Sequence, residues 1–183
     1  MKLRVISDVH VELYPSYQEL IQDLEEYISY NDSDEILILA GDVGIATDGN
    51  KINSDYFKIL RYFKSRWDTI ILVPGNHEYY NSQVSIEEVD KILSKTCRNL
   101  GIHFLNCKSI NLFGYTFIGC CLWSRINKEA YSYVNSSIQR LLPREKYLDT
   151  HYKHVDWLID ELNSNENTIV ITHYVPTPNL IDK

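Results

Sequence analysis

The sequence lacks the features that define a zinc ribbon or a membrane protein. Its four cysteines form no Cys-x-x-Cys pair, the usual spacing of a structural zinc site. No apolar run is long enough to cross a bilayer, and the apolar part of residues 1–6 is too short for a signal peptide. We therefore expect no membrane partner, a cytoplasmic location, and free cysteine thiols that are buried as small apolar groups.

An excess of positive charge is also missing. The chain has 18 Lys and Arg against 25 Asp and Glu, a formal net charge of −7. A chain of this charge attracts polyanions poorly at long range, which disfavours nucleic acid as a partner and nuclease action on DNA as an activity. There is no internal repeat, linker or low-complexity segment either. We expect a single domain over residues 1–183, of undetermined oligomeric state.

Short apolar runs alternate with helical patterns, which predicts an α/β fold. Buried strands are expected at residues 3–6, 36–39, 70–73 and 168–172. Capping-box patterns at Ser16–Glu19 and Ser85–Glu88 predict the beginnings of two helices, and Gly101 is placed to end the second.

The middle of the chain changes character. Residues 102–105, 109–113 and 115–121 are expected to be successive, antiparallel strands of a second sheet, with a turn at Gly114. The polar segment from residue 127 to 150 gives no clear pattern, and we expect it to form a wall of the substrate pocket. A helix is predicted from an apolar stripe of Val155, Leu158, Ile159 and Leu162.

Polar side chains gather directly after four of the predicted strands. They are Asp8 and His10, then Asp42, then Asn76 and His77, and finally His173. In open α/β sheets, ligands bind at the carboxyl ends of the strands. The sequence therefore predicts that these six side chains meet at one edge of a sheet.

These residue types form a donor set for divalent metals. Carboxylate, amide and imidazole ligands suit Mn, Fe, Zn or Ni. In an extended segment Asp8 and His10 point to the same side and can bind one ion, while Asp42 can bridge two. Two divalent ions, two aspartates and a bridging hydroxide leave a net positive charge, which attracts a phosphate ester.

Each motif alone has an ordinary explanation. Gly41-Asp42 is compatible with a simple turn, and a lone histidine after a strand is usually a hydrogen-bonded one. The order of all the motifs, each after a buried strand, is what favours a metal site. His103, His151 and His154 do not join the pattern. The last two have the spacing to share a metal on a helix, but we interpret them as part of a solvated face.

The order Asp8-x-His10, Gly41-Asp42, Gly75-Asn76-His77-Glu78 and Thr172-His173 resembles the calcineurin-like metallophosphoesterase superfamily. Two segments, Gly119-Cys120-Cys121-Leu122-Trp123-Ser124 and Thr172-His173-Tyr174-Val175-Pro176, also resemble its small microbial members. The resemblance implies a sandwich of two mixed β-sheets flanked by helices (α/β/β/α). It further implies that Asp8 and His10 ligate a first metal, that Asp42 bridges, and that Asn76 and His173 ligate a second. His77 would contact the phosphate and protonate the leaving oxygen as a catalytic residue.

The sequence departs from this family in two places. After Gly41-Asp42 it continues Val43-Gly44-Ile45-Ala46, without the Val-Asp-Arg-Gly of phosphoprotein phosphatases, so protein dephosphorylation is disfavoured. It also lacks the Gly-His-x-His motif that normally completes the site. We therefore expect a domain without its final segment, which binds its two divalent ions weakly and is nearly inactive.

Two functional hypotheses follow. The first is an enzyme that hydrolyses a small phosphomonoester or phosphodiester at a dinuclear metal centre, with a bridging hydroxide as the nucleophile. The alternative is a truncated, catalytically impaired binding module on the same fold.

Overall fold

The structure is a computed structural model that describes residues 1–28, 35–177 and 179, and it contains two main sheets. The first is wholly parallel, in the order β1 (Lys2–Ile6), β2 (Glu35–Ala40), β5 (Thr69–Val73) and β6 (His103–Phe104). The second has the order β7 (Lys108–Leu112), β8 (Tyr115–Cys120) and β9 (Thr168–Thr172). There β8 runs antiparallel to β7 and parallel to β9, so only this sheet is mixed.

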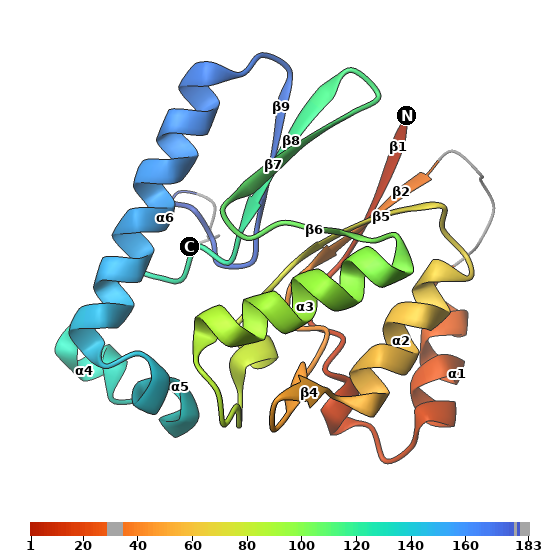
Figure 1. Cartoon of the computed structure of the whole chain (residues 1–183), viewed down its shortest axis with the longest axis horizontal. Coiled ribbons are helices and arrows are strands. Elements are labelled where there is room, and N and C mark those ends of the chain that lie inside the picture. Colours follow the sequence, from red (N-terminus) through yellow and green to blue (C-terminus); the bar gives the residue numbers. More distant parts are fainter. Residues whose placement is uncertain (29–34, 178, 180–183) are drawn as a thin grey trace.

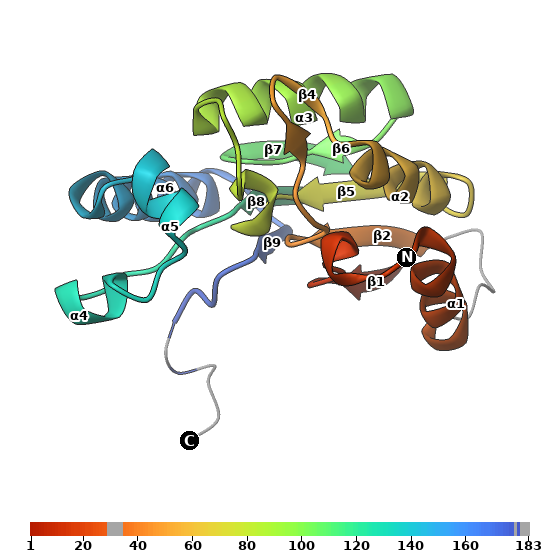
Figure 2. The same ribbon diagram turned by 90° about the horizontal axis from the view of Figure 1, so that it is seen from below.

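The two sheets face each other and helices cover the outer faces (Figures 1 and 2). The first sheet carries α1 (Tyr17–Tyr27), α2 (Ser54–Lys64) and α3 (Ile86–Leu100). The second carries α6 (Arg144–Ser164), which follows the short helices α4 (Lys128–Tyr131) and α5 (Ser136–Leu141). A small hairpin of β3 (Thr47–Asp48) and β4 (Lys51–Ile52) precedes α2. The predicted α/β/β/α sandwich is confirmed.

The alternation of side chains along the strands builds these layers. On β2, Leu37 and Leu39 point to the helices, while Ile36 and Ile38 point to the other sheet. From the second sheet, Phe117 enters the space between the sheets. A Cβ on Gly119 would lie 2.6 Å from a methyl group of Val73. Glycine at this position therefore lets the two sheets approach closely.

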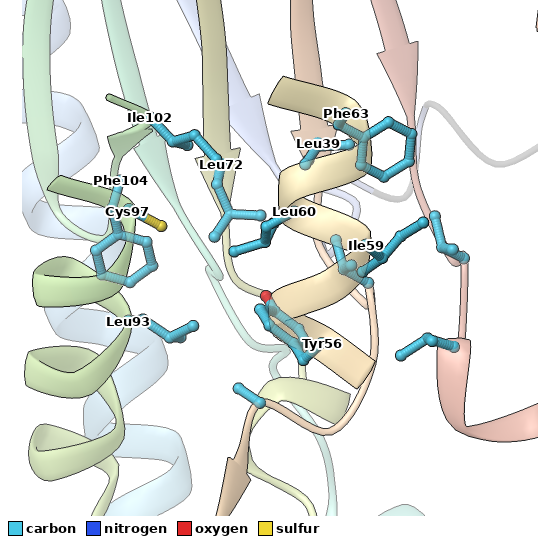
Figure 3. Packing of buried hydrophobic residues seen from close by; sticks show 14 of the residues in the cluster. Leu39, Tyr56, Ile59, Leu60, Phe63, Leu72, Leu93, Cys97, Ile102 and Phe104 are labelled. Carbon is cyan, nitrogen blue, oxygen red and sulfur yellow. The ribbon is translucent and has the colours of Figure 1, made fainter. Parts of the chain in front are cut away.

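The core on the helical side is continuous from α2 to α3 (Figure 3). Tyr56, Leu60 and Phe63 of α2 and Leu93 of α3 are fully buried there. Burial of one large apolar side chain stabilises the fold by about 1.5–3 kcal/mol. This packing holds α2 and α3 against the strands whose ends carry the predicted site.

Local signals in the sequence account for the helix ends. The hydroxyl of Ser16 accepts the N–H of Glu19 at 3.3 Å, and Ser85 caps α3 through Glu88 at the same distance. Gly101 ends α3 in the left-handed conformation, with φ of 68°. Gly114, with φ of 82°, occupies the predicted turn between β7 and β8.

Three expectations for the second half need correction. Residues 103–104 form β6 and pair with β5, so this strand belongs to the first sheet. On α6, Leu158 is buried, but Ile159 and Leu162 are 51% and 47% exposed. His154 is buried, and its Nδ1 accepts the N–H of Leu122 at 3.1 Å, so it does not lie on a solvated face.

None of the helices in the described part of the chain has the length and apolar character required to cross a membrane.

Candidate metal centre

The carboxyl ends of the strands bring the predicted ligands together. Because β1, β2 and β5 are parallel neighbours, Asp8, Asp42 and His77 follow them at one edge of the sheet. His173 arrives from β9 of the other sheet, with Nε2 3.4 Å from Asp42 Oδ2. Its Nδ1 donates to the carbonyl oxygen of Ala40 at 3.0 Å, which leaves Nε2 facing the site.

The backbone of the ligand loops is in an uncommon conformation. Asp8, His10 and Asp42 all have positive φ, between 50° and 56°, a region that Asp, Asn and His enter more readily than other non-glycine residues. The N–H of Asp8 donates to the oxygen of Gly41, and that of His10 to the oxygen of Asp42, both at 3.1 Å. These bonds between the loops fix conformations that each cost about 1–3 kcal/mol, as is common at functional sites.

Asp42 lies at the centre of the cluster and is 4% exposed. Its Oδ1 accepts the backbone N–H of His77 at 2.8 Å. Its Oδ2 faces three imidazole Nε2 atoms, at 3.4 Å for His173 and at 3.9 Å for both His10 and His77. Burial raises the pKa of Asp42, but the hydrogen bond and charge of His173, together with the N–H and charge of His77, outweigh it and hold the pKa below its ordinary value.

His173 shows the complementary shift. Burial lowers its pKa, yet the hydrogen bond and charge of Asp42, with a smaller contribution from the Ala40 carbonyl, raise the pKa to about 8. In the absence of a cation, His173 and Asp42 thus form an ion pair at neutral pH. A metal ligand must be neutral imidazole, so an ion bound here would displace this proton.

Asp8, His10 and Asp42 have the geometry of a chelating group. One ligand atom from each lies within 4.8 Å of the others, and His10 Nε2 is 3.6 Å from Asp8 Oδ1. Ligand atoms about 2.0–2.2 Å from a shared ion are roughly this far apart, so the donor set fits a divalent metal. The Asp8 side chain is 57% exposed, which leaves access from solvent.

Glu12 is a site residue that the sequence analysis missed. It lies on a 3₁₀ turn, η1 (Val11–Leu13), with Oε1 2.6 Å from His77 Nδ1 and 3.4 Å from His10 Nδ1. Its Oε2 is buried without a hydrogen-bond partner, and a Cβ on Gly44 would lie 2.7 Å from that atom. One carboxylate thus faces the outer nitrogens of two site histidines. The signal in the sequence was its position two residues after His10.

Asn76 is placed differently from the other predicted ligands. Its amide nitrogen donates to the Tyr80 hydroxyl, and its amide oxygen accepts from the Tyr174 hydroxyl, both at 2.9 Å. Among the interactions of the described residues, none joins this amide to Asp42. Tyr80 also stacks on the ring of His77, with 4.0 Å between centroids. Two tyrosines therefore flank this side of the site.

Glu78 organises the loops without facing the metal ligands. It is fully buried and accepts backbone N–H groups from Gly75 at 2.6 Å, Val43 at 2.8 Å and Asp42 at 3.0 Å. The Tyr56 hydroxyl donates to it at 3.1 Å. Burial and the charge of Asp42 raise the pKa of Glu78 to about 7, against the effect of the three N–H groups. A Cβ on Gly75 would collide with Asp42, so glycine is required there.

A hollow of about 580 Å³ opens beside the site. Its lining includes Asp8 and His10 as well as the less polar residues Leu13, Tyr14 and Pro15. The segment from residue 127 to 150, expected as a pocket wall, forms α4, α5 and the beginning of α6, and none of its residues lines this hollow. It contributes Tyr147 to an aromatic cluster with Trp123, which in turn packs against Tyr174.

Comparisons with known proteins identify the fold and the family. An uncharacterized protein of Acanthamoeba polyphaga mimivirus is 27% identical over 194 residues, covering 95% of this chain and 68% of that protein. The crystal structure of phosphopantetheinyl hydrolase (PptH) from Mycobacterium tuberculosis superposes with a TM-score of 0.66 at 18% identity. It covers 95% of this chain and 68% of that one, which shows a shared fold. The profile of calcineurin-like phosphoesterases matches residues 1–182, and the chain therefore belongs to that family.

Proposed function

We propose that this protein hydrolyses a small phosphate ester with the help of two divalent metal ions. The observation that carries the proposal is the environment of Asp42 Oδ2, a buried carboxylate oxygen faced by three imidazole nitrogens. Membership of the calcineurin-like phosphoesterases supports the same chemistry.

The donor set divides into two groups that share Asp42. Asp8, His10 and Asp42 would hold one ion, and Asp42, His173 and Asn76 the other. Asn76 would first exchange its hydrogen bonds with Tyr80 and Tyr174 for the metal. When bound, such a pair of ions supplies an activated water molecule and positive charge for the phosphoryl oxygens. The ligand types are compatible with Mn, Fe, Zn or Ni.

His77 is the proposed proton donor to the leaving oxygen. Its Nδ1 is held by Glu12 at 2.6 Å, and its ring is stacked on Tyr80, so the ring is fixed on both sides. Its Nε2 points toward Asp42 Oδ2, on the side where the ester would lie. Proton donation by a positioned side chain typically accelerates a reaction 10²–10⁴-fold.

The organic part of the ester has a place in the hollow beside Asp8 and His10. Leu13, Tyr14 and Pro15 give this hollow an apolar part, Glu19, Gln22 and Asp23 give it a polar part, and Asp8 links it to the metal side. We therefore place the leaving group or second substituent there, and the phosphate over Asp42.

The test is metal-dependent hydrolysis by the full chain. After chelation and dialysis, each of Mn²⁺, Fe²⁺, Zn²⁺ and Ni²⁺ is added back, with nitrophenyl and alkyl phosphate monoesters and diesters as substrates and a phosphopantetheinyl ester beside them. We expect turnover that returns with metal. Absence of turnover with every ion and substrate, in a chain that binds the metals, would contradict the proposal.

The variant His77→Ala tests the proton donor. It should retain metal and lose about 10²–10⁴-fold on alkyl esters, but much less on nitrophenyl esters, which need no proton on the leaving group. His103→Ala, on β6 away from the site, is the matched control. An equal loss on both classes of ester would rule out the donor role.

A further inference from the structure

Two cysteines face each other on the second sheet, away from the metal centre. Cys107 directly precedes β7 and Cys120 ends β8. The register pairs Lys108 with Gly119, and Cys107 and Cys120 are the residues next to this last pair; Cys107 itself lies just outside the strand, with φ of 48°. Cys107 packs against the apolar cluster that contains Cys120, and the contact between the two thiols is the largest influence on the pKa of each.

This arrangement brings the two thiols within reach of each other. Directly opposed residues of antiparallel strands, such as Lys108 and Gly119, have Cα atoms about 4.5–5.5 Å apart. Cys107 and Cys120 are the immediate neighbours of this pair, and a disulfide spans Cα separations of about 4.4–6.8 Å. A disulfide between them therefore requires only a local adjustment of the chain around Cys107.

His154 supports a thiolate at Cys107. Because its Nδ1 accepts the N–H of Leu122 at 3.1 Å, the hydrogen of the neutral ring is on Nε2. The ring is also close enough to Cys107 to stabilise its thiolate. Donation from Cys120 and then from His154 lowers the pKa of Cys107 to about 5, although burial opposes the shift. Lys108 and Asp90 are the other charged groups near this histidine and thiol.

The two thiols differ in their access to solvent. Cys107 is half-buried, whereas Cys120 is fully buried against Leu158 of α6. A small oxidant in solution therefore meets Cys107 first. Thiolate character and exposure together determine which cysteine is oxidised.

We propose that Cys107 and Cys120 form a reversible disulfide when the protein meets a peroxide. The Cys107 thiolate attacks one oxygen of hydrogen peroxide, giving a sulfenic acid and hydroxide. The Cys120 sulfur then displaces the sulfenic oxygen, which leaves as water with the thiol proton. The two sulfurs together lose two electrons, and the peroxide is reduced. A dithiol reductant restores both thiols.

The remaining cysteines provide internal controls. Cys121 neighbours Cys120 in sequence, but it lies in the other apolar cluster, on the side of the site. Cys97 is buried in α3, and burial raises its pKa to about 12. Burial keeps both of these thiols protonated, so oxidation should select Cys107 and Cys120.

The experiment is mass spectrometry of the 183-residue chain after treatment with millimolar hydrogen peroxide, with free thiols blocked before digestion. Trypsin separates residues 99–108, which contain Cys107, from residues 109–125, which contain Cys120 and Cys121. We expect these two peptides to be linked in the wild type and in Cys121→Ser. The link should be absent in Cys107→Ser and Cys120→Ser, and dithiothreitol should remove it.

Several results would overturn the proposal. They are a link that survives in Cys120→Ser but not in Cys121→Ser, a link to Cys97, or stepwise oxidation of Cys107 to a sulfinic acid with no link in the wild type. If Cys120→Ser folds poorly by circular dichroism, Cys120→Ala preserves the apolar environment and gives the same test. The disulfide does not depend on bound metal or on turnover, so its outcome is independent of the proposed activity.

Discussion

The two sheets contribute very unequally to the candidate metal centre. Asp8, His10, Asp42, Asn76 and His77 all follow strands of the first sheet, and His173 alone follows a strand of the second. Every strand of the first sheet is parallel, so every carboxyl end opens on the same edge. In the second sheet β7 runs against β8, and one of these strands must deliver its end to the opposite side. Parallel pairing therefore concentrates ligands, and the second sheet closes the site.

The variant Asp42→Asn is expected to have the largest effect, because Asp42 is proposed to belong to both metal groups. Loss of its charge should weaken both ions together and lower turnover by more than about 100-fold, beyond the 10–100-fold typical of supporting residues. Metal content after equilibrium dialysis measures the effect. Asp48→Asn on β3 is the control, an exposed carboxylate outside the site. Unchanged metal content in Asp42→Asn would disprove the shared role.

His173→Ala isolates the contribution of the second sheet. It should weaken one ion and leave the Asp8 and His10 group intact, so that titration gives about half the wild-type stoichiometry at limiting metal. His103→Ala should titrate like the wild type. Simultaneous loss of both ions in His173→Ala would mean that the two metal groups do not bind independently.

Glu12→Gln tests the metal group of Asp8 and His10 through a residue that contacts the outer nitrogen of His10. Carboxylates that orient site histidines typically contribute 10–100-fold to metal affinity or activity. We expect a loss of this size in turnover and weaker binding at the Asp8 and His10 group, with the His173 group unaffected. Glu26→Gln on the exposed face of α1 is the matched control. A loss confined to the His173 group would contradict the position of Glu12.

The smallest effect concerns the pH dependence of stability, through the buried carboxyl group of Asp90 on α3. Burial raises the pKa of Asp90 to about 6 from an ordinary 3.8, although Tyr79 and Asn106 donate hydrogen bonds to it. Between these two pH values the folded state binds more protons than the unfolded one. The contribution of Asp90 to the free energy of unfolding should therefore fall as pH rises from about 4 to 6, by up to 1.4 kcal/mol per unit.

Urea unfolding across that pH range measures this dependence. Asp90→Asn should have a smaller slope than the wild type, and Asp149→Asn, an exposed carboxylate on α6, should keep it. A slope that is the same in all three proteins would show that Asp90 does not titrate there.

The first half of the fold was predictable because its signals are local. Unbroken apolar runs identified the buried strands, and Ser16 and Ser85 marked the helix starts. Since parallel strands share one edge, ligands after each strand could be expected to meet. The second half of the fold was harder to predict from the sequence. The pairing of residues 103–104 with β5 and the burial of His154 depend on tertiary contacts that no local pattern encodes.

The supporting residues of the site were missed for the same reason. No sequence pattern distinguishes Glu12 from other acidic residues. Its role is visible only in the structure, where its Oε1 lies 2.6 Å from Nδ1 of His77, 65 positions later. Glu78 was part of a recognised motif, yet three of its four hydrogen bonds reach back to the loop after β2 and to α2. Ligands follow from sequence order, whereas the residues that hold them follow from contacts across the fold.

The buried carboxylate of Glu78 has a consequence for the kinetics of metal uptake. It joins main-chain amides of both ligand loops to Tyr56 on α2 through hydrogen bonds between protein groups alone. These bonds do not involve the side chains proposed as ligands, so little of the chain must become ordered when an ion enters the group of Asp8 and His10. Uptake of that ion should be limited by removal of water from the ion, with an observed rate that rises linearly with metal concentration, whereas a plateau is expected only for an ion that must wait for Asn76 to exchange its hydrogen bonds.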